Sequence, residues 1–271
     1  MWGIIPAAGN GTRIQPLAFS KELLPVGSRN DGTTERPKAV SEYLVERFML
    51  AGVHKICFVI GPSKLDIVQY YGARVGSADI AFVVQSQAAG LCDAIFRAVP
   101  LIGEDEPVAV GLPDTIWFPE HALLELPQDR LSFLLFPVAH PQLFDSVTTE
   151  PDGRVLSIDV KSKQPRSGWI WGAFRMPGPV FHELHRLWMA RGGRDEYFGT
   201  LVNAWISQGG DAVGVRAGSA YVDVGTLHGY REAMQLLSAP GAVSRLDRWP
   251  RSSEPAEPDR PRRTRVKPAP T

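Results

Sequence analysis

The sequence predicts an α/β fold in which helices cover both faces of a doubly wound, mostly parallel mixed sheet. Two observations lead to this prediction. Between residues 2 and 112, short apolar runs alternate with segments whose apolar residues recur at helical spacing. The runs are apolar throughout, as in parallel strands that are buried on both faces. Strands and helices that alternate in this way build Rossmann-like sheets, whose ligands bind beyond the carboxyl ends of the strands.

The first half of the chain supplies the regular part of this pattern. Runs rich in Val, Ile and Phe predict strands at residues 2–6, 55–60, 79–85 and 107–112. Helical spacing of apolar residues predicts helices at residues 39–51, 63–71 and 91–99. Gly52 directly follows the first of these helices, as expected at a helix C-terminus.

The second half is less regular, and we expect it to add strands to the same sheet and to build a lid or a pocket. Its apolar runs predict strands at residues 131–138, 154–161, 168–176, 211–216 and 220–224. Helical spacing predicts helices at residues 179–191, 197–208 and 228–238. Residues 239–271 are rich in Pro and Arg and poor in large apolar side chains, which predicts a disordered tail.

Composition limits the function classes. The chain has 271 residues, 44% of them hydrophobic, and a formal net charge of zero. These values are typical of a globular protein and argue against a nucleic-acid binder. No apolar run is long enough to span a bilayer, and no signal peptide is evident. Cys57 and Cys92 form no CxxC pair, and Cys57 lies in an apolar run, so we expect a reducing, cytoplasmic location.

A glycine-rich loop follows the first predicted strand, in the stretch AAGNGTRIQPLAFSKELLPV at residues 7–26. Such a loop directs backbone N–H groups at an anion, and Arg13 and Lys21 add positive charge. The loop is neither a Walker A motif nor the full G-x-G-x-x-G fingerprint, so by itself it is a weak signal. It predicts a polyphosphate site, with an ordinary turn between strand and helix as the alternative.

The residues around this loop resemble the signature of the sugar-phosphate nucleotidylyltransferases, also called nucleotide-diphosphate-sugar pyrophosphorylases. That signature reads G-x-G-T-R-x-x-P, then K-x-L-L-P-[IV] after a short spacer. This sequence has GNGTR at residues 9–13, Pro16-Leu17, and KELLPV at residues 21–26. The resemblance continues to about residue 236, with an insertion near residues 28–34 that precedes Arg36-Pro37-Lys38.

The resemblance implies a transferase domain at residues 1–238, with a nucleotide-binding part at about 1–120 and a sugar-phosphate part at about 121–238. In this family a sugar-1-phosphate oxygen attacks the α-phosphorus of a nucleoside triphosphate, and pyrophosphate leaves. Positioning and electrostatics dominate such transfers. The resemblance implies that Arg13 contacts the departing β- and γ-phosphates and that Lys21 contacts the α-phosphate. Members of the family often assemble, so a homo-oligomer is possible.

Two aspartates match the metal-binding positions of the family. Asp114 follows the predicted strand at 107–112, in Leu112-Pro113-Asp114, and Asp223 lies in the late segment YVDVGT at residues 221–226. The resemblance implies that both bind Mg²⁺, a hard cation that prefers carboxylate oxygens and retains several waters. An aspartate that caps the next turn is the alternative at Asp114.

Nucleotide binding is implied for residues in two segments. These residues are Ala8, Gly9, Gly11, Thr12, Gln85 and Gly90. The Gln85 amide is expected to read a pyrimidine by donating one hydrogen bond and accepting another. Cys92 and Asp93 depart from the family segment and leave the base preference open. Some features of the sequence resemble the UTP-dependent members of the family and others resemble the dTTP-dependent members, so both triphosphates stay open.

The sugar side matches the family less closely. The resemblance implies that Lys161 holds the sugar phosphate, with Lys163 as the alternative because both lie on one face of the predicted strand. Gly172 and Glu196 match sugar-binding positions. Departures at Val160, Ser162, Gly168, Gly199 and Thr200 predict an unusual hexose or reduced activity.

These departures leave two alternatives open: a weakened homologue that binds nucleotide sugar as a sensor or regulatory subunit, and a transferase for another phosphorylated alcohol such as phosphocholine. The chain retains all four charged residues that the resemblance places at the phosphates and the metal, and this argues against a binder without turnover. They are Arg13, Lys21, Asp114 and Asp223. Two further patterns are expected to be structural: His182 and His185 are three residues apart rather than four as in a zinc helix, and Trp169 and Trp171 alternate as strand residues do.

Overall fold

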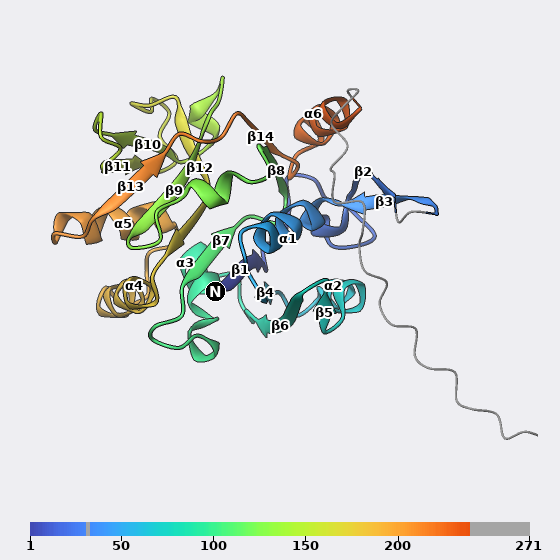
Figure 1. Ribbon diagram of the computed structural model, residues 1–271, viewed down its shortest axis with the longest axis horizontal. Coiled ribbons are helices and arrows are strands. Elements are labelled where there is room, and N and C mark those ends of the chain that lie inside the picture. The colour runs from blue at the N-terminus through green and yellow to red at the C-terminus, as the bar shows by residue number, and fades with distance from the viewer. Residues whose placement is uncertain (31–32, 239–271) are drawn as a thin grey trace, which may run out of the picture.

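A ten-stranded mixed sheet forms the centre of the protein, as Figure 1 shows for the computed structural model. The structure describes residues 1–30 and 33–238, so the predicted tail at 239–271 lies outside the described part. Parallel pairing joins the strands in the order β7, β1, β4 and β6. These strands are β1 (Trp2–Ala7), β4 (Lys55–Ile60), β6 (Ala78–Val84) and β7 (Val108–Gly111). The predicted fold class is confirmed.

The second half of the chain continues the same sheet, as predicted, but chiefly through antiparallel pairs. β12 (Trp169–Met176) pairs antiparallel with β7, and β9 (Leu131–Pro137) pairs antiparallel with β12. The sheet is completed by β5 (Arg74–Val75), β10 (Ser146–Thr149), β11 (Val155–Asp159) and β13 (Ala212–Val215).

Helices cover both faces because successive residues of a strand point in opposite directions. On β1, Ile4 faces one apolar core and Ile5 faces the other. The core that contains Ile4 packs against α3 (Leu91–Phe96), α4 (Gly178–Ala190) and α5 (Phe198–Ser207). The core that contains Ile5 packs against α1 (Val40–Leu50) and α2 (Leu65–Tyr71).

A third, smaller core lies beside the sheet under the last helix. It joins one antiparallel strand pair, β8 (Thr115–Phe118) with β14 (Ala220–Asp223), to a hairpin of β2 (Pro25–Asn30) and β3 (Glu35–Ala39). The helix α6 (Leu227–Leu237) covers this core, and Figure 1 shows it above the hairpin. The hairpin spans the insertion expected near residues 28–34, of which residues 31–32 are outside the described part.

Several predicted elements were wrong in extent, and several observed strands were not predicted. The hairpin and the strands β5 and β10 lack a sustained apolar run, and the apolar strand β8 is only four residues long. No α-helix follows the glycine loop before α1 in the described residues; the first helical turn is the 3-10 helix η1 (Lys21–Leu23). The predicted helix 91–99 ends at Phe96 and continues as η2 (Val99–Leu101), which contains Pro100. The other 3-10 helices are η3 (Ala122–Glu125) and η4 (Pro141–Leu143).

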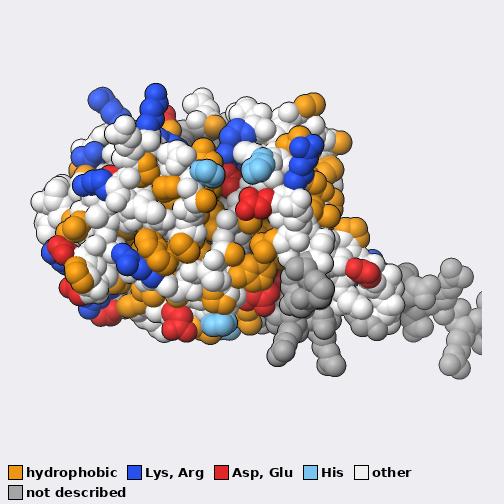
Figure 2. Space-filling view, turned by 90° about the horizontal axis from the view of Figure 1, so that it is seen from above, with side chains coloured by type: hydrophobic (Ala, Val, Ile, Leu, Met, Phe, Trp, Pro, Cys, Tyr) orange, Lys and Arg blue, Asp and Glu red, His pale blue; other side chains and the backbone are white. Residues whose placement is uncertain are grey.

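Cys57 and Cys92 are both buried and free, and burial raises the pKa of the Cys57 thiol to about 12. Among the described helices, none has the length and apolar character needed to cross a membrane. Figure 2 shows acidic, basic and apolar side chains intermixed on the face that it displays, in line with the net charge of zero.

Candidate active site

Asp114 and Asp223 are brought together by a strand pair. Asp114 follows the end of β7 and directly precedes β8, while Asp223 is the last residue of β14. The register of the pair places Asp223 opposite Thr115, and the Val224 N–H donates to the Asp114 carbonyl oxygen at 2.8 Å. The two aspartates are 109 positions apart in the sequence, so this antiparallel pairing is what makes them neighbours.

Each aspartate forms an ion pair with one of the two cations of the glycine loop region. Lys21 Nζ lies 2.5 Å from Asp114 Oδ2, and Arg13 Nη1 lies 2.9 Å from Asp223 Oδ2. Burial opposes the charge of Lys21, but Asp114 outweighs burial and raises the pKa of Lys21 above its ordinary value. Burial also opposes the charge of Asp114, yet Lys21 holds the pKa of Asp114 below its ordinary range. Both groups are therefore charged at neutral pH.

Gly225 leaves a space between the two carboxylates. A methyl group built on Gly225 would lie 2.8 Å from Asp114 Oδ2, 2.8 Å from Asp223 Oδ1 and 3.1 Å from Arg13 Nη2. Carboxylate oxygens from two segments thus converge on one small gap. Magnesium is bound in proteins through one or two carboxylates together with waters and substrate oxygens, so this donor set fits the ion.

Gly11 shapes the loop that carries Arg13. Its φ of 64° lies in the left-handed region, and a Cβ there would approach the Lys21 side chain to 2.9 Å. The Gly11 carbonyl accepts hydrogen bonds from the N–H groups of Ile14 and Gln15, which closes the turn containing Arg13. Gly9 has open space around its Cβ position. Glycine at position 11 is therefore required for the approach of loop and lysine.

The loop runs between two cavities. One, of about 670 Å³, is lined by Gly9, Arg13, Lys21, Asp114 and Asp223. Further residues that line it are Lys161, Asp145, Trp171, Tyr197 and Tyr221. The other cavity, of about 470 Å³, is lined by Ala8, Asn10, Gly61, Ser63 and Gln85, among others.

Lys161 lies in a turn rather than on a strand, which corrects the prediction for this segment. The strand β11 ends at Asp159, and Lys161 has a φ of 49°, in the left-handed region. Its N–H donates to Asp145 Oδ1 at 3.2 Å, and its Nζ lies 5.6 Å from the Tyr197 ring centroid. Lys163 therefore does not share a strand face with Lys161, contrary to the prediction, because the strand ends at Asp159. Only Lys161 of the two lines the larger cavity.

The Gln85 side chain uses its amide hydrogens within the protein. Nε2 donates to Asp93 Oδ2 at 2.7 Å and to the Gly90 carbonyl oxygen at 3.2 Å. The expectation that Gln85 both donates to a base and accepts from it was therefore wrong in its donor half. The Gln85 oxygen is the atom that is left for a ligand.

Five predicted site residues line neither cavity: Gly11, described above, Thr12, Gly90, Gly172 and Glu196. Thr12 is exposed, and Gly90 packs against Glu196, whose carbonyl accepts from the Leu91 N–H at 2.7 Å. Gly172 lies at an irregularity in β12, where a Cβ would approach the rings of Phe136 and Tyr221 to 2.6 Å. Gly90 and Glu196 thus join the two halves of the chain, and Gly172 packs beneath the Tyr221 ring.

Three residues that line the larger cavity were not predicted: Asp145, Tyr197 and Tyr221. Asp145 directly precedes β10, a strand that was not predicted, and burial raises the pKa of its carboxyl. The β-branched run at residues 147–149 was the signal that could have located this strand end. Tyr221 is the first residue of the YVDVGT segment and Tyr197 directly follows Glu196, so adjacency to predicted site residues was the available signal for both tyrosines.

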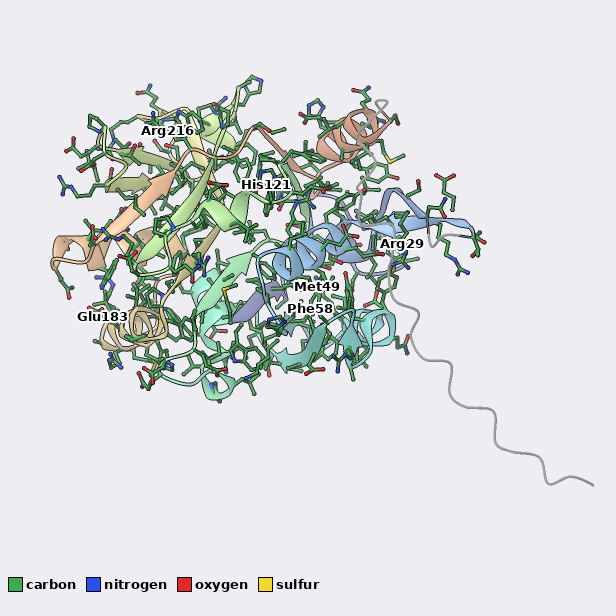
Figure 3. All side chains as sticks on the ribbon, in the orientation of Figure 1. Arg29, Met49, Phe58, His121, Glu183 and Arg216 are labelled. Atoms are coloured by element: carbon green, nitrogen blue, oxygen red, sulfur yellow. The ribbon has the colours of Figure 1, made fainter. Side chains whose placement is uncertain are left out.

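The predicted structural roles of the histidines agree with the structure. His182 is buried, and its Nε2 lies 3.1 Å from the Ile102 carbonyl oxygen, while His185 packs against Phe96. Glu183 between them is exposed at the edge of the molecule, as Figure 3 shows, and the described residues contain no cluster of metal-ligating side chains there.

The two tryptophans of β12 differ. Trp169 packs beside Arg216, also labelled in Figure 3, with the guanidinium 5.1 Å from its ring centroid. Trp171 is buried but lines the larger cavity. Both tryptophans therefore pack as expected, and Trp171 is a buried core residue that also contributes to the lining of the larger cavity.

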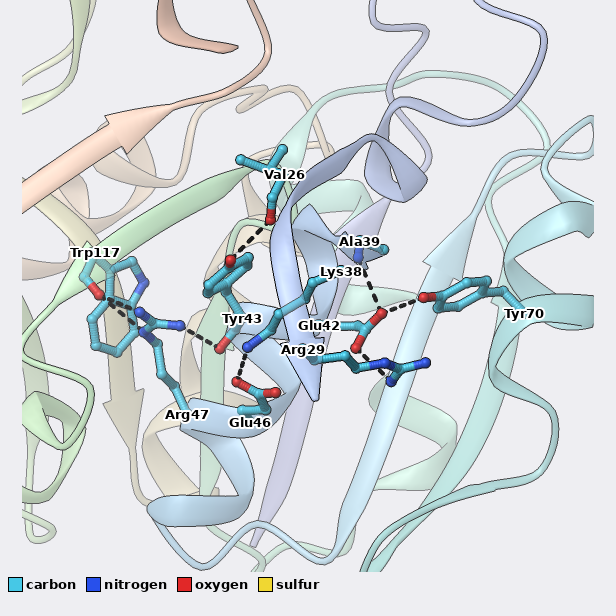
Figure 4. Close-up of polar contacts among 10 residues, drawn as sticks. All are labelled: Val26, Arg29, Lys38, Ala39, Glu42, Tyr43, Glu46, Arg47, Tyr70 and Trp117. Atoms are coloured by element: carbon cyan, nitrogen blue, oxygen red, sulfur yellow. Dashed lines mark hydrogen bonds and ion pairs between the residues drawn. The ribbon is translucent and has the colours of Figure 1, made fainter. Parts of the chain in front are cut away.

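A buried arginine supports the strand that follows Asp114. Arg47 of α1 donates through Nε and Nη2 to the Trp117 carbonyl oxygen, at 3.0 and 2.6 Å, and through Nη1 to the Tyr43 carbonyl oxygen at 2.8 Å. Burial lowers the pKa of Arg47 to about 10, so it stays charged at neutral pH. Figure 4 shows it beside the Lys38–Glu46 ion pair of 2.5 Å. Because Trp117 pairs with Tyr221, this contact fixes the strand pair that positions both aspartates.

Comparisons with known proteins identify the family of this chain. The family model described as nucleotidyl transferase matches residues 2–239. Glucose-1-phosphate thymidylyltransferase of Mycobacterium tuberculosis (strain H37Rv) is 31% identical over 265 residues, which cover 92% of this chain and 84% of that protein.

Two solved structures are similar in fold. A structure assigned as glucose-1-phosphate thymidylyltransferase from Bacillus anthracis, in complex with a sucrose, superposes with a TM-score of 0.72 at 24% identity, covering 86% of this chain and 94% of that one. The UTP-bound UGPase from Acinetobacter baumannii superposes with a TM-score of 0.70 at 19% identity, covering 89% of this chain and 95% of that one.

Proposed function

The chain belongs to the nucleotidyl transferase family, and from this premise we propose that it transfers a nucleotidyl group from UTP or dTTP to a sugar-1-phosphate such as glucose-1-phosphate. The products are a nucleotide-diphosphate sugar and pyrophosphate. The relative that is named for thymidylyl transfer to glucose-1-phosphate supports the choice of substrates.

The observation that carries the proposal is the meeting of Arg13, Lys21, Asp114 and Asp223 around one gap. A sugar-phosphate oxygen attacks the α-phosphorus while the bond to the β-phosphate oxygen breaks, so negative charge grows on the α-phosphoryl and leaving groups. Lys21 would contact the α-phosphate, and Arg13, whose side chain is 59% exposed, would contact the departing pyrophosphate. Fixed cations at these places lower the barrier electrostatically.

Asp114 and Asp223 would hold Mg²⁺ at the gap beside Gly225. When bound, the ion would neutralise phosphate charge and orient the triphosphate. The two aspartates also hold Lys21 and Arg13 in place, so the chain orders its cations before any substrate arrives.

The two cavities suggest where each substrate binds. Gln85 in the smaller cavity would contact the base, and Lys161 in the larger cavity would contact the phosphate of the sugar. Gly172 and Glu196 would act on the sugar pocket through neighbours that line it, Tyr221 and Tyr197. The cytoplasmic location and a homo-oligomer stay predictions.

The test is pyrophosphate release by the purified protein with Mg²⁺ and glucose-1-phosphate, with UTP, dTTP, CTP, ATP and GTP assayed separately. We expect release that requires both substrates and is fastest with UTP or dTTP. If no triphosphate and no other hexose-1-phosphate gave release while a nucleotide sugar bound, the chain would be a sensor rather than a transferase.

The variant Asp114→Asn tests the role of Asp114, because it keeps the shape of the side chain and removes its charge. We expect turnover to fall by about 100-fold or more, since this charge both positions Lys21 and is needed for the metal. Thermal unfolding of the variant checks that it folds. Turnover at the wild-type rate would refute the assignment of Asp114.

A further inference from the structure

The Gln85 amide contacts a buried carboxylate of α3, that of Asp93. Asp93 is buried and accepts the Gln85 Nε2 hydrogen bond at 2.7 Å. Arg97, one turn further along, holds the same carboxylate through Nε at 3.2 Å and Nη2 at 2.9 Å. Arg97 thus holds both oxygens of the carboxylate, including Oδ2, which also accepts from Gln85.

The two amide atoms of Gln85 are distinguished by chemistry here. The amide nitrogen carries two hydrogens, and the amide oxygen carries none. An ionised carboxylate and a backbone carbonyl are both acceptors, so only the nitrogen can face Asp93 and Gly90 together. Among the residues that the structure describes, none donates a hydrogen bond to Gln85 Oε1. A ligand in the cavity of about 470 Å³ that Gln85 lines would therefore meet a hydrogen-bond acceptor.

We propose that Asp93 is a positioning residue that selects the base, because it makes Gln85 present its oxygen to the nucleotide. The inference rests on the proposed function, in which the base occupies the Gln85 cavity. Uracil and thymine carry a hydrogen on N3, which can donate to this oxygen. Cytosine has an unprotonated N3 at the same ring position, so two acceptors would face each other. Asp93 thus favours UTP or dTTP over CTP.

The test is the variant Asp93→Asn, which keeps the shape and removes the acceptor-only character. Asp93 Oδ2 accepts from both Gln85 Nε2 and Arg97 Nε, and Oδ1 accepts from Arg97 Nη2. The amide of the variant has a single oxygen and cannot accept from all three donors, so Gln85 no longer has one preferred orientation. Dissociation constants for UTP and CTP are measured by calorimetry, together with kcat/KM for both. We expect the wild-type preference for UTP, at least about tenfold, to fall to about twofold in the variant.

The control is Asp195→Asn. Asp195 is also buried and is also held by an arginine, with Arg191 Nε 2.7 Å from Oδ2, but Gln85 donates to Asp93 instead. We expect this variant to keep the wild-type ratio of UTP to CTP affinity. An unchanged ratio in Asp93→Asn, or a wild-type preference for CTP, would overturn the inference.

A probe of the wild-type protein covers the case in which Asp93→Asn does not fold. UTP methylated on N3 lacks the donor, and we expect it to bind about tenfold more weakly than UTP, whereas dTTP should bind within a few-fold of UTP. Equal affinity for UTP and its N3-methyl form would sink the inference. These experiments measure binding, so they test base selection separately from nucleotidyl transfer. A protein that binds UTP selectively but releases no pyrophosphate would contradict the proposed transfer and leave the role of Asp93 intact.

Discussion

Single side chains in this site hold one another in their charged forms. The pKa of Lys21 is raised and that of Asp114 is lowered, because the attraction between the two charges outweighs the opposing effect of burial. A buried charge without a partner is costly in free energy, so the ion pairs stabilise the charged forms of both groups in a site that is partly shielded from water. The gap at Gly225 exists only because this position has no side chain.

Gly225→Ala tests this gap. The new methyl group would lie 2.8 Å from an oxygen of each carboxylate, closer than carbon and oxygen normally approach, so the carboxylates must separate. We expect the dissociation constant of Mg²⁺, measured by calorimetry with nucleotide present, to rise by about tenfold or more. Gly168→Ala is the control, since a Cβ there meets nothing within 4 Å. Equal Mg²⁺ affinity in both variants would contradict the metal assignment.

At the scale of elements, a turn and not a strand presents the lysine of the larger cavity. β11 ends at Asp159, and the backbone of Lys161 takes a left-handed φ while Asp145 accepts its N–H. Strand periodicity would have given Lys161 and Lys163 equivalent positions. The turn removes that equivalence and brings only Lys161 to the cavity lining.

The pair Lys161→Ala and Lys163→Ala is therefore a matched comparison within one turn. We expect Lys161→Ala to raise the KM for the sugar-1-phosphate by about tenfold, because a charge-assisted contact to phosphate is lost, and to leave the KM for the triphosphate unchanged. Lys163→Ala should behave as wild type. The reverse result in initial-rate kinetics would move the sugar-phosphate contact to Lys163.

At the scale of the whole molecule, the two ends of the parallel strands have different tasks. The site lies beyond their carboxyl ends, and at the other end Glu106 ties strands together. Glu106 Oε1 accepts from Lys55 Nζ of β4 at 2.8 Å, and Oε2 accepts from Trp2 Nε1 of β1 at 3.0 Å. The Lys55 bond, with the Gly103 N–H and Trp2, lowers the pKa of Glu106 to about 2.

This pKa predicts a pH dependence of stability. A glutamate in an unfolded chain has a pKa of about 4.3, so the stabilisation by Glu106 is complete above about pH 4.3 and is lost as the pH falls towards 2. In urea unfolding, the difference between wild type and Glu106→Gln should be constant from pH 7 to about 5 and clearly smaller at pH 3. The variant should keep its turnover at pH 7, because Glu106 lies far from the carboxyl ends of the strands.

Asp105→Asn is the control for this series, since Asp105 is the exposed neighbour of Glu106. It should unfold like wild type at every pH. A difference for Glu106→Gln that persists undiminished at pH 3 would show that its carboxyl contributes through shape rather than charge.

The sequence by itself determined the alternation of strands and helices and singled out Arg13, Lys21, Asp114 and Asp223 as candidates, because both rest on local signals. Apolar periodicity depends only on residues that are close in the sequence, and the glycine loop with Arg13 and Lys21 is one continuous motif. Short strands such as β8 and β10 escaped prediction because partner strands from elsewhere in the chain stabilise them.

Only the tertiary structure decided how these charges pair and which atoms face a ligand. The pairing of Lys21 with Asp114 and of Arg13 with Asp223 depends on the register of β8 and β14. The hydrogen bond that the Gln85 amide nitrogen donates to Asp93 depends on where α3 places Asp93. Hydrogen bonds act over about 3 Å, and contacts at that range between distant segments are set by packing, not by spacing in the sequence.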